Sequence, residues 1–199
     1  MPVIGLLGGV ASGKSFVART FAELGAGVLD ADRAGHEVLE MPEVKAAAQR
    51  RWGDLIFDAA GEIDRKQLAK IVFAPPPAGP AQREYLEQIT HPQIGRLLMR
   101  QADEMAASGC KAAVLDAPLL LEAGWDRFCD TLVFVDAPCR LRLARARQRG
   151  WSEKEFAVRE GAQESLDSKQ KRADVVVDNS GSPEQTQAQV DRLWHSLIG

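Results

Sequence analysis

The sequence predicts an α/β fold in which helices flank a five-stranded parallel sheet. Three observations predict it: short apolar runs alternate with segments of helical periodicity, the first run leads into a glycine pair, and the composition is globular, with 45% hydrophobic and 27% charged residues. Strands that are separated by helices need crossover connections, which place them parallel in one sheet. The predicted strands span residues 3–7, 27–30, 112–116, 131–136 and 173–177.

The helices follow from apolar residues that recur three and four positions apart. This spacing predicts a helix over 15–24, which Gly25 ends, and a final helix over 183–197. Between the second and third strands the chain is mostly helical. The prolines of 75–80 interrupt that stretch, because proline cannot continue a helix. The helices expected in this insertion span residues 32–39, 42–52, 65–73 and 81–107.

Composition and charge exclude several classes of protein. The net charge of −3 does not indicate a broad nucleic-acid-binding surface. No apolar run reaches the roughly 18 residues of a membrane helix. Three scattered cysteines are too few for a disulfide framework or a Cys-rich zinc site, which fits a reducing cytosol. We therefore expect a cytoplasmic protein without nucleic-acid or membrane partners, a monomer or weak homo-oligomer, whose apolar N-terminus is a buried strand and not a signal peptide.

A glycine-rich motif follows the first strand. Residues 8–15 match G-x-x-x-x-G-K-[ST] in full, between a predicted strand and a predicted helix. Glycines let backbone N–H groups turn toward a phosphate, and the helix N-terminus adds partial positive charge. Lys14 would bridge the β- and γ-phosphates, and the Ser15 hydroxyl would hold Mg²⁺. We therefore predict that a nucleoside triphosphate binds to Gly8, Gly9, Val10, Ala11, Ser12, Gly13, Lys14 and Ser15.

Nucleotide binding alone fits either a GTPase-type switch or a kinase that acts on a small molecule. A guanine-specific switch reads its base with an Asn-Lys-x-Asp segment, whereas this chain has a single asparagine, Asn179, which Ser180 follows. Two D-x-x-G strings occur, at 32–35 and 58–61, but the first opens a predicted helix and the second lies in the insertion. The sequence therefore favours a kinase.

Carboxylates stand at the ends of two predicted strands. Asp30 and Asp32 follow the second strand two residues apart, so both could face the phosphate loop. One of them could accept the proton of an attacking hydroxyl. The alternative is that Asp32 only caps the next helix. Asp116 ends the third strand in the position of a carboxylate that organises Mg²⁺, and a role as a helix cap or turn residue is the alternative there.

Five arginines lie within ten residues that contain no acid: Arg140, Arg142, Arg145, Arg147 and Arg149. Arg142, Arg145 and Arg149 share one helical face. Uncompensated cations beside a nucleotide site suggest contacts with the transferring phosphoryl group. Each arginine taken singly could instead belong to a solvated basic helix. The basic stretch continues, mixed with acids, and we predict a mobile lid over 140–172.

Taken together, these segments resemble the dephospho-coenzyme A kinase family over nearly the whole chain. The phosphate loop alone is shared by many families. The Asp-Ala-Asp of 30–32, the His-Pro of 91–92 and the Asp-x-Pro-Leu-Leu-x-Glu of 116–122 are together much more specific. Further matching pieces are the arginines of 145–149, Gln163, Lys169, Ala173, Asp174 and the segment 178–181.

Three positions depart from the family pattern. Phe16 stands where the family usually has threonine, Ala11 where glycine is frequent, and Leu121 where phenylalanine is common. None of these changes removes a group to which we assign chemistry. Ala11 is expected to restrict the loop backbone slightly, because alanine is less free than glycine.

The resemblance implies a P-loop nucleoside triphosphate hydrolase-type core in three segments, 1–31, 111–139 and 173–199. It also implies a helical domain over 32–110 that binds the acceptor, and the lid over 140–172. The implied activity is transfer of the γ-phosphate of ATP, with Mg²⁺, to the ribose 3′-hydroxyl of dephospho-coenzyme A, the last step of coenzyme A biosynthesis. The alternative is a kinase of nucleosides or nucleoside monophosphates with the same core.

The resemblance also assigns site residues. Asp32 would orient or deprotonate the acceptor hydroxyl, and Lys14 and Arg145 would stabilise charge on the transferring phosphoryl group. The nucleotide site would extend from the phosphate loop to Phe16 and Arg149. Ser15 and Asp116 would hold the metal. The implied acceptor residues are Asp30, Asp32, Arg65, His91 and Leu119.

Overall fold

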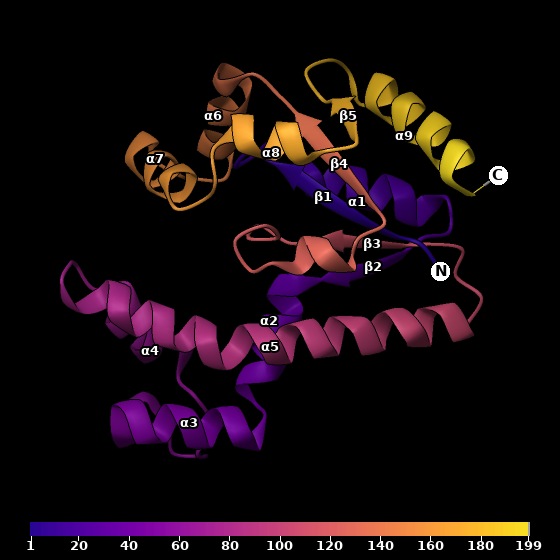
Figure 1. Ribbon diagram of the computed structural model, residues 1–199. Helices are drawn as coiled ribbons and strands as arrows, with labels where there is room; N and C mark the ends of the chain where they lie inside the picture. Colours follow the sequence, from indigo (N-terminus) through magenta and orange to yellow (C-terminus); the bar gives the residue numbers. More distant parts are fainter. Residues whose placement is uncertain (199) are drawn as a thin grey trace. The chain divides into compact units, whose positions relative to one another are not determined.

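The computed structural model describes residues 1–198, and the strands within that range form one parallel sheet (Figure 1). The strand order is β2-β3-β1-β4-β5, so β1, which is buried along its whole length, lies at the centre. The predicted α/β fold class is confirmed. The strands are β1 (Val3–Gly8), β2 (Gly27–Asp30), β3 (Ala113–Asp116), β4 (Thr131–Asp136) and β5 (Val175–Asp178).

Helices connect the strands and lie close to where the sequence predicts them. The fifth strand begins two residues later than expected, at Val175, and the helix of the insertion that was expected to begin at 81 begins at Ala78. Pro80 therefore lies in the first helical turn, where its missing N–H costs no hydrogen bond. The helices are α1 (Lys14–Glu23), α2 (Ala31–Leu39), α3 (Pro42–Trp52), α4 (Arg65–Val72), α5 (Ala78–Ala107), α6 (Cys139–Gln148), α7 (Glu153–Gly161), α8 (Leu166–Arg172) and α9 (Pro183–Ile198), with short 3₁₀ turns η1 (Gly53–Ile56) and η2 (Trp125–Phe128).

The two faces of the sheet are covered by different helices. Val17 and Phe21 of α1, one helical turn apart, pack with Trp194 of α9 against Ile4 and other side chains on one face of the sheet. The Phe21 and Trp194 rings are 6.3 Å apart. Helix α8 packs against β1 and β4, and Figure 1 shows it on the side of the sheet opposite α1. This double cover explains why the strands read as continuous apolar runs.

The chain forms two compact units. The first consists of Met1–Ala31 and the chain from Met99 onward, and the second is Asp32–Leu98. The second boundary between the units falls inside α5, after Leu98, whereas the sequence predicted it after residue 110. The second unit has its own core, in which Ile56, Leu68 and other apolar side chains are buried. None of the helices in the described range is long and apolar enough to cross a bilayer.

Candidate active site

The phosphate loop is a buried and tightly turned connection between β1 and α1. Gly8 and Gly13 have φ angles of 148° and 103°, which glycine adopts without strain. Ala11 is also left-handed, with φ of 57°. A Cβ atom at Gly13 would lie 2.0 Å from the amide nitrogen of Asn179, so no side chain fits there. The side chain of Ser12 is buried, and within residues 1–198 its hydroxyl has no hydrogen-bond partner.

Lys14 and Ser15 begin α1, directly after the loop. The Lys14 Nζ donates a hydrogen bond to the Gly8 carbonyl oxygen at 3.3 Å, which folds the side chain back over the loop. The Ser15 hydroxyl donates to Oδ2 of Asp116 at 2.9 Å. The structure thus brings together a helix N-terminus, a lysine and a hydroxyl–carboxylate pair, an arrangement suited to a polyphosphate.

The Ser15–Asp116 pair fits Mg²⁺. It offers hard oxygen donors, and Mg²⁺ in phosphate-transfer sites binds through one or two carboxylates together with substrate phosphates and water. Residues 1–198 contain no cluster of three or more His, Cys, Asp or Glu side chains that could hold a metal ion. The donors therefore suit a metal that arrives with the nucleotide.

The predicted carboxylates occupy two different settings. Asp30 ends β2 and pairs in register with Asp116 at the end of β3, so these two carboxylates stand at the same edge of the sheet. Asp32 is the second residue of α2, which begins at Ala31. It is therefore not the residue that precedes the helix, and the capping alternative does not describe its position. A carboxylate in the first turn instead interacts favourably with the helix dipole.

The arginine-rich helix α6 contacts the carbonyl groups of the phosphate loop. Nη1 of Arg145 donates to the Ser12 carbonyl oxygen at 2.9 Å, and Nη2 donates to that of Asn179, also at 2.9 Å. The Asn179 amide donates to the same Ser12 oxygen at 2.7 Å. Burial, with the nearby positive charge of Arg149, lowers the pKa of Arg145. The group stays charged at neutral pH, because an arginine pKa starts far above 7.

The remaining predicted nucleotide and acceptor residues are spread over the chain. Phe16 lies in α1 with the Arg19 guanidinium 5.9 Å from its ring, and Arg149 lies 5.9 Å from the Trp151 ring. Leu119 is half-buried in the turn after β3. His91 is half-buried in α5, and burial lowers its pKa, although Glu87 opposes the shift. Phe16, Leu119 and Arg149 belong to the first unit, and His91 belongs to the second.

Arg65 lines a pocket of the second unit. The pocket has a volume of about 640 Å³ and lies among α2, α3 and the start of α4. Its wall includes an ion pair between Lys45 and Glu62. The other lining side chains are His36, Leu39, Glu40, Ile63 and Arg65. Of the five acceptor residues expected from the sequence, Arg65 is the one that lies in this pocket.

Two residues of the site were not selected from the sequence. Asn179 belongs to the segment 178–181 that resembles the family, but the sequence assigns it no contact; in the structure its amide bonds the phosphate loop and its Oδ1 accepts from Thr186 at 3.0 Å. Arg142 was grouped with the basic helix but given no function, yet its side chain is buried against the loop. Gly13 is a sequence signal for the Asn179 contact, because glycine is needed where another group approaches the backbone closely.

Comparison with known proteins identifies the family. The family model described as dephospho-CoA kinase matches residues 2–185. The dephospho-CoA kinase of Bacillus licheniformis is 42% identical over 201 residues, which cover 98% of this chain and 98% of that protein. The chain belongs to the dephospho-CoA kinase family.

Solved structures agree with this dephospho-CoA kinase family assignment at the level of the fold. The crystal structure of TT1252 from Thermus thermophilus has a TM-score of 0.81 and 32% identity, and the match covers 100% of this chain and 98% of that one. The dephospho-CoA kinase from Campylobacter jejuni has a TM-score of 0.65 and 21% identity, covering 98% and 97% of the two chains. These matches extend over both units of the chain.

Proposed function

We propose that this protein phosphorylates the ribose 3′-hydroxyl of dephospho-coenzyme A with ATP, giving coenzyme A and ADP, the last step of coenzyme A biosynthesis. The observation that carries the proposal is the family match over residues 2–185. It is supported by Lys14, which bonds the Gly8 carbonyl of the phosphate loop, and by the hydrogen bond from Ser15 to Asp116. We also propose a cytoplasmic enzyme that acts as a monomer or weak homo-oligomer.

In the proposed reaction the 3′-oxygen attacks the γ-phosphorus of ATP, and the bond to the oxygen that bridges the β- and γ-phosphorus atoms breaks. The backbone N–H groups of the phosphate loop bind the phosphates, and Lys14 neutralises charge on them. Asp32 orients the acceptor hydroxyl and takes its proton, and Asp30 supports it. Ser15 and Asp116 would hold Mg²⁺ together with ATP, and the ion would supply positive charge that offsets the charge of the phosphates.

Arg145 is proposed to stabilise the charge that develops on the transferring phosphoryl group. Arg149 and Phe16 are proposed to contribute to nucleotide binding. Two of the five N–H groups of the Arg145 guanidinium already bond the Ser12 and Asn179 carbonyls. Those bonds fix its position at the loop, and a charge that is fixed in advance stabilises a transition state without reorganisation. Residues 140–172 are proposed as the lid.

The helical unit is proposed to bind the acceptor. Its 640 Å³ pocket is large enough for part of a coenzyme-sized molecule, and the exposed Arg65 could contact an anionic group there. His91 and Leu119 complete the proposed acceptor set. A kinase of nucleosides or nucleoside monophosphates is less favoured, because the matched family is named for dephospho-CoA.

An ADP-release assay tests the proposal. The purified protein is supplied with ATP, Mg²⁺ and one acceptor at a time: dephospho-coenzyme A, adenosine or a common nucleoside monophosphate. We expect ADP release that depends on dephospho-coenzyme A, with coenzyme A as the second product. Activity confined to a nucleoside or a monophosphate would reject the proposal.

A further inference from the structure

Arg142 is a buried cation that the proposed chemistry does not use. Its side chain is 3% exposed. Its Nε donates to the Ala137 carbonyl oxygen at 3.1 Å, and its Nη1 donates to the Val10 carbonyl oxygen at 3.3 Å and to the Glu160 carboxylate. The three acceptors belong to the turn after β4, the phosphate loop and α7. A planar guanidinium with five donors can serve all three at once, which an ammonium group does less well.

The Val10 carbonyl needs such a donor. A loop that turns its N–H groups toward a phosphate turns some of its carbonyl groups away, and a buried carbonyl without a partner is costly. Val10 and Ala11 are 8% exposed and pack with Ala146 and Phe156, so water is largely excluded from this side of the loop. A Cβ atom at Gly9 would lie 2.7 Å from Nη1 of Arg142, which shows how closely the guanidinium approaches the loop backbone.

We propose that Arg142 is a positioning residue for the nucleotide. It holds the Gly9–Ala11 part of the phosphate loop in the conformation that binds phosphate, and it joins that part of the loop to α7 through Glu160. This inference rests on ATP binding to the loop, as proposed above. When Arg142 is replaced, the peptide group at Val10 loses its donor and can reorient. The first consequence is weaker ATP binding, before any effect on the acceptor.

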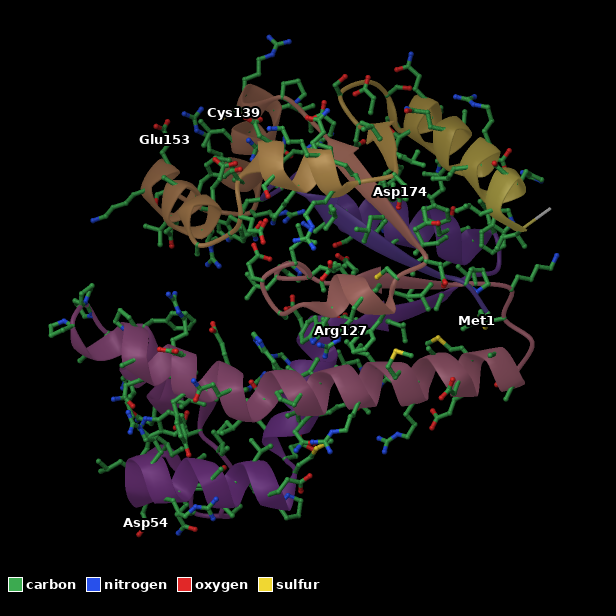
Figure 2. The ribbon with its side chains drawn as sticks, in the orientation of Figure 1. Met1, Asp54, Arg127, Cys139, Glu153 and Asp174 are labelled. Carbon is green, nitrogen blue, oxygen red and sulfur yellow. The ribbon has the colours of Figure 1, made fainter. Side chains whose placement is uncertain are left out.

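The structure supplies two controls for this proposal. Arg147 and Glu153 form a second ion pair between α6 and α7, with side chains 59% and 66% exposed (Glu153 is labelled in Figure 2). This pair joins the same two helices at the surface. The second control is Glu160→Gln, because glutamine removes the counter-charge of Arg142 but leaves the Val10 bond possible. It separates loss of stability from loss of loop geometry.

The test is equilibrium titration of the intact protein with ATP, without acceptor, for Arg142→Lys, Glu160→Gln and Arg147→Gln, with thermal melts and steady-state KM values alongside. We expect Arg142→Lys to weaken ATP binding about tenfold while the KM for dephospho-coenzyme A changes less than about twofold. Glu160→Gln should lower the melting temperature yet keep ATP affinity within about twofold. Arg147→Gln should change neither.

Three results would overturn the proposal. The first is a folded Arg142→Lys protein with unchanged ATP affinity. The second is an equal loss of affinity in Glu160→Gln or Arg147→Gln, which would assign the effect to helix packing. If Arg142→Lys does not fold, Arg142→Gln replaces it, and failure of both to fold would assign Arg142 to the core alone. Because no acceptor is present in the titration, its outcome does not depend on which molecule is phosphorylated.

Discussion

The phosphate loop and the pocket of the helical unit are built in opposite ways. In the loop, Val10, Ala11 and Ser12 are buried, and donors from α6 and Asn179 bond its carbonyl groups. The pocket is lined largely by long polar side chains, and His36, Glu40 and Arg65 are exposed. Exposed side chains lose rotamer freedom when a ligand orders them, which costs free energy of binding. The loop is already ordered in the folded protein, so its conformational entropy was lost during folding.

This difference suggests how the work is divided between the two regions. In the proposed reaction the loop would bind phosphate with a geometry that is set in advance, and this is what stabilisation of a transition state requires. The pocket is proposed to hold part of the larger acceptor, so its contribution should appear mainly in the affinity for the acceptor. Substitutions in the loop should therefore affect turnover, and those in the pocket should affect KM.

The sharpest test of the loop side of this comparison is Lys14→Ala. We expect no measurable turnover, because the lysine that neutralises the transferring phosphoryl group is lost. The melting temperature should change little, since the side chain lies outside the core. The exposed Lys111→Ala serves as the matched control in steady-state assays and melts. Turnover near the wild-type value in a folded Lys14→Ala protein would remove the loop from the site.

Asp32→Asn tests whether a carboxylate adds proton transfer to this preset geometry. General-base assistance is worth about 10²–10⁴-fold, so kcat should fall in that range while the melting temperature barely moves. Asparagine has nearly the same shape, and the lost dipole interaction costs only about 0.3–1 kcal/mol. The measurement is kcat with both substrates saturating.

Asp30→Asn is the control for that measurement, and we expect a smaller kinetic loss there. A larger loss at Asp30 would mean that the other carboxylate of the pair is the base. If neither variant loses activity, positioning and electrostatics alone carry the rate, which a loose transition state permits.

Arg65→Ala tests the pocket side of the comparison. We expect the KM for dephospho-coenzyme A to rise about three- to tenfold, the range of an exposed charge contact, with the KM for ATP unchanged. Lys66→Ala, an exposed cation that follows it in the same helix, is the control for loss of one positive charge. Equal effects of the two variants would reduce Arg65 to a contribution to the overall field of the protein.

The smallest expected effect belongs to Ala11→Gly. Glycine removes the strain of a left-handed alanine, about 1–2 kcal/mol, but it also makes the unfolded chain more flexible, at a cost of about 0.4–1 kcal/mol. The free energy of unfolding should therefore change by no more than about 1.6 kcal/mol, toward higher stability. Chemical denaturation measures this change. A clear destabilisation would show that the Ala11 methyl group packs more strongly with Phe156 than the strain costs.

The sheet and the loop could be predicted from the sequence because local patterns determine them. Strands buried on both faces appear as apolar runs, and Gly8 and Gly13 are needed for the backbone angles of the loop. The family resemblance was likewise carried by contiguous motifs. The sequence does not distinguish an aspartate that precedes a helix from one in its first turn, so it left both positions open for Asp32.

The contacts on the carbonyl side of the loop could not be predicted in the same way. Arg142, Arg145 and Arg149 share a helical face, but which of them reaches the loop depends on how α6 packs. In the structure Arg142 and Arg145 bond loop carbonyls, whereas Arg149 lies against Trp151. Asn179 is 167 residues from Ser12 in the chain, a contact that no local pattern contains.

The buried hydroxyl of Ser12 connects the stability of this protein with its activity. A buried hydroxyl without a partner lowers the stability of the unliganded fold by about 1–3 kcal/mol. A phosphate oxygen that accepted its hydrogen would recover that energy on binding. An alanine at this position would then raise the stability of the unliganded protein and weaken its binding of the nucleotide. Selection for thermal stability alone would act against the serine, and selection for nucleotide binding would retain it.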